Sequence, residues 1–190
     1  MRRSLILATA AFAGSLLAGG LANAGAVADL YRGGAFGLPW NAGKAAIEAK
    51  YPGGKWDEDG KGRARYCVAT KQTLLKLPAP HQTTELCMLI GTDNTLASVT
   101  AVMEPSLASL LAVVNRCRTT FGDFDAVVRD ETAIQSRSNA MLWTTEGRYV
   151  VQVESQNNEV GSPTRVAFTV ADEANLYTEG AKKVSSRPGS

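Results

Sequence analysis

Nucleophilic catalysis in this 190-residue sequence would have to use His81, because it is the only histidine. A Ser-His-Asp or Cys-His site pairs an imidazole base with an activated nucleophile. His81 lies in the proline-bearing stretch 77–82, and the sequence contains no Gly-x-Ser-x-Gly or Ser-x-x-Lys motif. Glycine-rich phosphate-binding motifs are also missing. We therefore expect an exposed loop histidine, no catalytic residue and a non-catalytic protein.

The acidic run Asp-Glu-Asp-Gly at residues 57–60 resembles the start of a calcium-binding loop. An EF-hand loop needs a glutamate at its twelfth position, and counting from Asp57 that position is Val68. The run is therefore predicted to be a solvated polar turn rather than a metal site.

A second group of acidic residues follows residue 122. Two carboxylates can hydrolyse a glycosidic bond when they converge in a cleft. This leaves open the alternative of a small periplasmic hydrolase or ligand-binding protein. It predicts one pocket that joins Trp56, Asp57 or Asp59 to the second group. That group comprises Asp123, Asp125, Asp130 and Glu131.

The cysteines indicate a structural disulfide more than chemistry. Cys67 and Cys87 fall on the less apolar face of neighbouring predicted strands, where opposed side chains come within disulfide distance. We predict a bond between them that stabilises the fold by about 3 kcal/mol. Cys117 falls in an apolar helical stripe and is predicted to be a buried free thiol. The two other pairings would each join this core cysteine to one on the sheet surface. Cys-x-x-Cys and zinc-type spacings do not occur, so no cofactor or metal is predicted.

Aromatic and proline residues define a candidate contact surface. Trp40 and Trp56 flank the first predicted helix and could bind a sugar or a protein. The alternative is that Trp40 and Tyr51 staple this helix onto the sheet, because large aromatic side chains are usually buried. Residues 71–83 form a long loop that two prolines make stiff. The candidate surface comprises Trp40, Trp56, Pro78, Pro80 and His81.

Residues 1–24 have the pattern of a cleavable export signal. Arg2 and Arg3 precede an apolar stretch that ends at the small-residue sequence Ala-Asn-Ala, residues 22–24. We predict cleavage after Ala24 and a periplasmic or secreted protein, exported by either the general or the twin-arginine route. This apolar stretch is too short to span a bilayer comfortably, and no transmembrane segment is expected after cleavage.

Loss of this segment changes the charge of the chain. The whole sequence carries 20 basic and 18 acidic side chains, and the segment holds two arginines and no acid, so residues 25–190 carry 18 of each sign. Such a balance, without long basic runs, does not favour nucleic acid or an anionic membrane as the partner. We expect a protein partner in the cell envelope instead.

The first half of the chain predicts one helix and three strands. The helix covers residues 42–50, is capped by Asn41 and stops at the Pro-Gly-Gly sequence 52–54. A polar loop at 56–62 follows, and Asp93-Asn94 is expected to form a two-residue turn. The strands are predicted at 63–70, 84–91 and 95–103. That turn would pair Ile90 with Ala97, Met88 with Val99 and Leu86 with Ala101.

The second half repeats this order. A helix is predicted to begin at Pro105-Ser106 and to end at Phe121, before Gly122. Its apolar stripe comprises Leu107, Leu110, Leu111, Val114, Cys117 and Phe121. Strands are predicted near 126–128 and at 140–145, 148–155 and 164–171.

These patterns predict an α+β fold with antiparallel sheets and two helices. The units of helix plus three strands are either a degenerate tandem repeat or a simple alternation in one domain. The domain would cover 36–178, with subunits 36–103 and 104–178, a loose leader at 25–35 and a flexible tail at 179–190. This element order is similar to that of the β-lactamase inhibitor proteins, and no functional residue is carried over from them. The sequence favours an exported interaction or accessory protein, of an inhibitor or immunity type.

Overall fold

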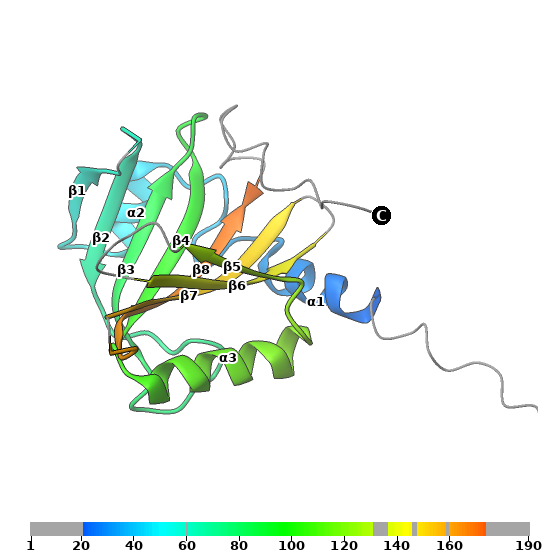
Figure 1. Ribbon diagram of the computed structural model, residues 1–190. Coiled ribbons are helices and arrows are strands. Elements are labelled where there is room, and N and C mark those ends of the chain that lie inside the picture. The colour runs from blue at the N-terminus through cyan, green and yellow to red at the C-terminus, as the bar shows by residue number, and fades with distance from the viewer. Residues whose placement is uncertain (1–20, 60, 131–136, 146–147, 159, 174–190) are drawn as a thin grey trace, which may run out of the picture.

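An antiparallel sheet of eight strands forms the centre of the computed structural model, which describes residues 21–59, 61–130, 137–145, 148–158 and 160–173. The strand order is β1-β2-β3-β4-β8-β7-β6-β5 (Figure 1). The helices within the described ranges are α1 (Leu21–Tyr31), α2 (Lys44–Lys50) and α3 (Leu107–Phe121). The strands are β1 (Lys55–Glu58), β2 (Ala64–Ala69), β3 (Thr83–Ile90), β4 (Leu96–Met103), β5 (Ala126–Asp130), β6 (Arg137–Thr144), β7 (Tyr149–Asn157) and β8 (Pro163–Asp172). The predicted α+β class is confirmed, with three helices instead of two.

The sheet is made of two meanders joined side by side. We call α2 with β1–β4 the N-terminal unit and α3 with β5–β8 the C-terminal unit. Within each unit, consecutive strands are neighbours, and the last strands of the two units, β4 and β8, pair with each other. Thr100 and Thr169 face each other at this junction, with their Oγ1 atoms 2.9 Å apart. One continuous hydrophobic core therefore draws on both units.

The register of the central hairpin agrees with the predicted one for two of three pairs. Met88 faces Val99 and Leu86 faces Ala101, but Ile90 faces Leu96. The turn is longer than two residues: the Gly91 N–H donates to the Thr95 carbonyl at 2.8 Å, and Asn94 has a φ of 60°. A three-residue loop that ends in a left-handed residue adds a bulge to the ladder, which shifts the last pair.

Strand β1 occupies part of the predicted polar loop at 56–62, so that prediction is wrong there. Trp56 faces Tyr66 on β2 with ring centroids 5.0 Å apart. On the other face, Asp57 pairs with Arg65 of the neighbouring strand at 2.6 Å. Charged residues are typical of edge strands because they discourage pairing with other chains. They also interrupt the alternation of apolar and polar residues from which a strand is predicted.

The predicted loose leader at 25–35 is instead largely helical. Helix α1 buries Val27 and Tyr31, which lie four residues apart and therefore on one face. The Tyr31 ring packs 6.2 Å from Phe121 and 6.5 Å from Phe168. Because the sequence of this segment is rich in alanine and glycine, it does not indicate that Val27 and Tyr31 attach the helix to the core. The predicted cleavage point after Ala24 falls inside α1, and most of the predicted signal and the whole tail lie outside the described residues.

Helix α2 lacks the predicted cap. Gly43 is its N-cap residue and makes no side-chain cap hydrogen bond. Asn41 is exposed and lies outside the helix. A turn in which the Ala42 N–H donates to the Pro39 carbonyl comes first, so the helix begins only after Gly43. By contrast, α3 begins at a capping residue: Ser106 Oγ accepts from the Ser109 N–H at 3.0 Å.

The predicted apolar stripe of α3 is only partly correct. Leu107 and Leu111 are 59% and 52% exposed. The buried ridge runs along Ser109, Val113, Val114, Cys117 and Phe121. Two neighbouring rows of residues spaced by four are both rich in apolar side chains, so the pattern alone did not identify the row that faces the sheet.

Candidate functional site

The three helices pack against one face of the sheet and leave the other face uncovered by any described helix. Ile47 of α2, Val113 of α3 and Tyr31 of α1 share the core with the strand residues that point toward them. Figure 1 shows α2 behind the β1–β3 part of the sheet and α3 below β5–β7. The alternate strand residues form what we call the open face. It includes Arg65, Cys67, Glu85, Cys87, Thr100, Val102, Gln152, Glu154 and Thr169.

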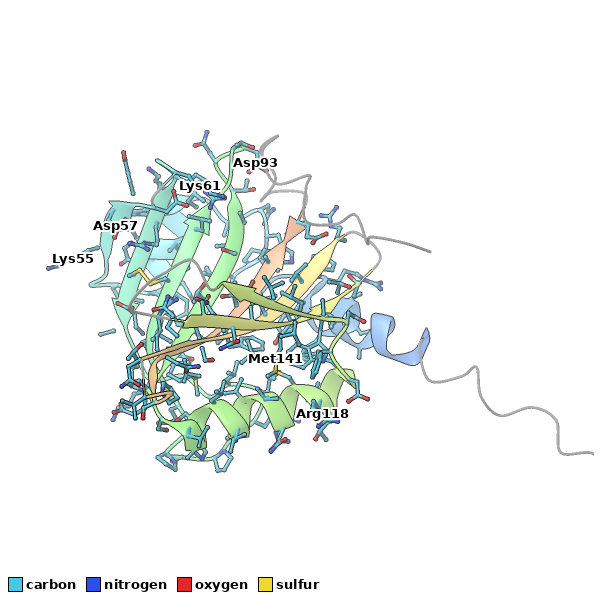
Figure 2. All side chains as sticks on the ribbon, in the orientation of Figure 1. Lys55, Asp57, Lys61, Asp93, Arg118 and Met141 are labelled. Atoms are coloured by element: carbon cyan, nitrogen blue, oxygen red, sulfur yellow. A yellow bond between two sulfur atoms is a disulfide. The ribbon has the colours of Figure 1, made fainter. Side chains whose placement is uncertain are left out.

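The predicted disulfide lies on the open face. Cys67 and Cys87 are direct cross-strand partners with Cα atoms 4.1 Å apart, and their sulfur atoms are bonded at 2.05 Å (Figure 2). The Glu85 carboxylate lies within 4.8 Å of both sulfurs. Thiolate sulfur and carboxylate oxygen are zinc-type ligands, but sulfurs bonded to each other are not thiolates. In this state the group is a covalent link between β2 and β3.

Further cross-strand contacts stiffen the same face. Arg65 donates two hydrogen bonds to Asp57, at 2.9 and 2.6 Å, which hold the pKa of that carboxyl below its usual range. Ser138 donates to Glu154 at 3.2 Å across β6 and β7, and Arg165 of β8 lies 3.9 Å from the same carboxylate. These contacts run from one edge of the sheet across its width, so the open face is a pre-organised surface.

The structure does not bring the two acidic groups together. Asp57 and Asp59 lie on and just after β1, whereas Asp123 and Asp125 precede β5, and these strands are the two outer strands of the sheet. Asp59 pairs with Arg63 at 2.7 Å and Asp123 with Arg118 at 2.7 Å.

A hydrogen bond to a neighbouring strand engages Asp125, a third member of the second group. Asp125 accepts from the Thr144 N–H at 2.7 Å. Asp130 ends β5, and Glu131 lies outside the described residues. The described carboxylates therefore support local turns and strand ends rather than a shared pocket.

The candidate contact residues occupy three places. Trp40 is buried: its Nε1–H donates to the Tyr31 carbonyl at 2.7 Å, and its ring stacks on Tyr149 at 6.0 Å. It belongs to the core, so its assignment to a contact surface is wrong. Trp56 is half-buried at the β1 edge, under the Lys44 ammonium group. Pro78 and Pro80 are exposed at the tip of the β2–β3 loop, and the half-buried His81 follows them.

No motif in the sequence indicates the neighbour of His81, which comes from a different segment of the chain. The His81 Nδ1 lies 3.5 Å from Ser109 Oγ, on the first turn of α3. Ser109 is 3% exposed and accepts a hydrogen bond from Ser106 Oγ at 2.9 Å. A serine nucleophile needs access to substrate and a base held by a third group. The geometry of this Ser-His pair instead ties the loop to the start of the helix.

The third cysteine is a buried free thiol, as predicted. Cys117 lies on the buried ridge of α3, and burial raises its pKa to about 12. A thiol with this pKa is protonated at neutral pH, and the thiolate is the reactive form. Cys117 is therefore a core residue.

Comparisons with models of protein families, with curated proteins and with solved structures find no match. Among the described helices, none has both the length and the apolar character that crossing a membrane requires.

Proposed function

We propose that this chain is an exported, non-catalytic protein that binds a folded protein of the cell envelope through the open face. The observation that carries the proposal is the eight-stranded sheet whose three helices all pack on one side. Its role would be that of an inhibitor, an immunity factor or an envelope accessory protein.

The chemistry of the open face fits a protein partner. Short side chains such as Thr100 and Thr169 occupy its middle strands. Charged side chains on this face are neutralised by ion pairs such as that of Arg65 with Asp57. The disulfide and the cross-strand hydrogen bonds fix these groups before binding, which lowers the entropy cost of association. A neutral, polar surface of this kind fits a partner surface of similar polarity rather than a polyanion.

Two features support export. The arginines, apolar run and Ala-Asn-Ala sequence of residues 1–24 match a signal segment. The Cys67–Cys87 bond is typical of proteins in oxidising compartments. Mass spectrometry of the protein recovered from its host's envelope tests this step: an N-terminus at Gly25 is expected, and an intact Met1 in the cytoplasmic fraction would contradict it.

We further propose that the two units are a degenerate repeat of a helix followed by four strands. In both, an aromatic residue of the second strand hydrogen-bonds to a glycine that follows the helix, although these two aromatic residues lie two positions apart when the units are matched about Thr100 and Thr169. Tyr66 Oη accepts from the Gly54 N–H at 2.8 Å, and Trp143 Nε1–H donates to the Gly122 carbonyl at 2.9 Å. A repeat would give the open face two similar halves, related about the Thr100–Thr169 contact.

A photo-crosslinking scan in cells tests the function. A photoreactive residue replaces Thr169 or Gln152 on the open face, or Asn115 or Ala45 on exposed helix positions. We expect one cross-linked protein species from the open-face positions and none from the helix positions. Cross-links that form equally from both sets, or only from the helices, would overturn the proposal.

The acidic-site alternative has less support. It requires Asp57 or Asp59 to share a pocket with Asp123 or Asp125, and these residues belong to opposite edges of the sheet. Double replacement Asp59→Asn and Asp123→Asn, which leaves the Arg65–Asp57 pair of the open face intact, is therefore expected to leave cross-linking unchanged.

A further inference from the structure

A groove on the helix side of the molecule is independent of the open face. It lies between α1, the segment after α1, the β2–β3 loop and α3, and it has a volume of about 610 Å³. Pockets of about 300–1,000 Å³ accommodate small organic ligands. Figure 1 shows α1 beside the C-terminal end of α3. Its apolar walls include Leu30, Tyr31, Phe36, Leu74 and Leu75.

The charged side chains along this groove are all positive. Lys76 and Arg116 line it, and Lys50 lines a smaller cavity that shares Phe36 with it. None of the described residues that line these two cavities is an acid. Since residues 25–190 carry equal numbers of basic and acidic side chains, this local excess of cations is a feature of the groove. It is complementary to an anion.

The loop that supplies Lys76 has an unusual backbone. Leu75 and Lys76 have φ angles of 47° and 58°, a conformation that residues with a side chain rarely adopt. The flanking Leu74 and Leu77 are 2% and 6% exposed, so their burial holds the loop in place. Such backbone strain is concentrated at ligand sites, where the surrounding fold maintains it.

We propose that this groove binds an amphiphilic anion of the fatty-acid class, with one alkyl chain and a carboxylate. The alkyl chain lies along Leu30, Phe36 and Leu75, where it buries apolar surface. The carboxylate lies between Lys76 and Arg116 and accepts charge-assisted hydrogen bonds from them. Binding therefore depends on both parts of the ligand: the alkyl chain contacts the apolar residues of the groove, and the carboxylate pairs with the cations at its rim.

Calorimetry with laurate, below the concentration at which it forms micelles, tests the proposal on the protein as purified from cells. We expect saturable binding of one laurate. Dodecanol, with the same chain and no charge, is expected to bind about tenfold more weakly, and hexanoate not at all. Absence of laurate binding, or equal binding of laurate and dodecanol, would overturn the proposal.

Three variants locate the site. Lys76→Gln with Arg116→Gln is expected to weaken laurate about tenfold and to leave dodecanol unchanged. Leu75→Asn suits the left-handed backbone, so it retains the fold while it weakens both ligands. Arg118→Gln, on the same helix but outside the groove lining (Figure 2), is the matched control and is expected to change neither. Laurate affinity that is insensitive to the first two variants would place binding elsewhere and refute the site.

Discussion

The N-terminal unit has a helix of 7 residues and the C-terminal unit one of 15, although each helix precedes four strands in the same order. Helix α2 buries one of its own side chains, Ile47. Helix α3 buries five, along the ridge that ends at Phe121. The two units therefore differ in how much apolar contact their helices provide.

Polar and covalent links replace that contact in the N-terminal unit. The Tyr66 hydroxyl donates to the Tyr51 carbonyl at 2.7 Å and accepts from the Gly54 N–H. The Tyr51 hydroxyl donates to the Phe36 carbonyl at 2.6 Å. The Cys67–Cys87 bond joins the second and third strands of this unit.

At the position that corresponds to Cys67–Cys87, the described residues of the C-terminal unit carry no disulfide bond. Thr100 faces Cys87 and Thr169 faces Gln152, so matching the units about these threonines sets the cysteine pair against Leu142 and Gln152. One sheet layout can therefore be stabilised either by a long amphipathic helix or by cross-links around a short one.

The largest effect is expected from truncation in the C-terminal unit. Phe121→Ala removes a side chain that is 1% exposed and contacts Tyr31 and Trp143, so it should lower the free energy of unfolding by about 4 kcal/mol. Urea denaturation gives the value. Ile47→Ala is the partner variant, with an expected loss of about 3 kcal/mol. A larger loss for Ile47→Ala would mean that α2 contributes more apolar contact to stability than α3.

Removal of the disulfide should destabilise the N-terminal unit. Cys67→Ser with Cys87→Ser is expected to lower the free energy of unfolding by about 3 kcal/mol, since the bond closes a loop with a sequence separation of 20. Hydrogen exchange should show faster opening in β1–β3 than in β5–β7. Equal acceleration in both units would mean that they are stabilised as one, contrary to the comparison.

The tyrosine links should contribute less than the disulfide. Tyr66→Phe removes a donor to Tyr51 and an acceptor for Gly54, so a loss of about 2 kcal/mol is expected in thermal or urea unfolding. Tyr149→Phe, whose hydroxyl donates to the Arg32 carbonyl at a longer distance of 3.3 Å, is the control. We expect it to lose less than half as much.

The caps should give the smallest effects. Ser106→Ala is expected to cost about 1 kcal/mol, because Ser106 Oγ accepts from the Ser109 N–H. Asn41→Ala should leave stability unchanged, since Asn41 lies outside α2 and is exposed. A measurable loss for Asn41→Ala would restore the cap that the sequence predicts.

The sequence predicted best where burial follows a simple period. Alternating apolar residues identified β2, β3, β4, β7 and β8, and the shared face of two such strands located the Cys67–Cys87 pair. Prediction failed where local sequence hides tertiary contact. Trp56 and Asp57 form a strand because Tyr66 and Arg65 lie across from them, which only the paired strand reveals.

The open face and the groove were beyond prediction for a related reason. The open face exists because β4 pairs with β8, a contact between residues far apart in the chain. The groove joins Leu30, Leu75 and Arg116 from three separate segments. Periodicity within one segment identifies its buried side but not the segment that will lie against it.

The most direct test of the open face as the binding surface is a single arginine substitution in its middle. Thr169→Arg is compared with Asn115→Arg on the exposed side of α3, after thermal unfolding has shown that both fold. The readout is the affinity of each variant for the protein cross-linked from the open face. We predict a loss of a hundredfold or more for Thr169→Arg and no change for Asn115→Arg. Unchanged affinity for Thr169→Arg would contradict the assignment of the open face as the binding surface.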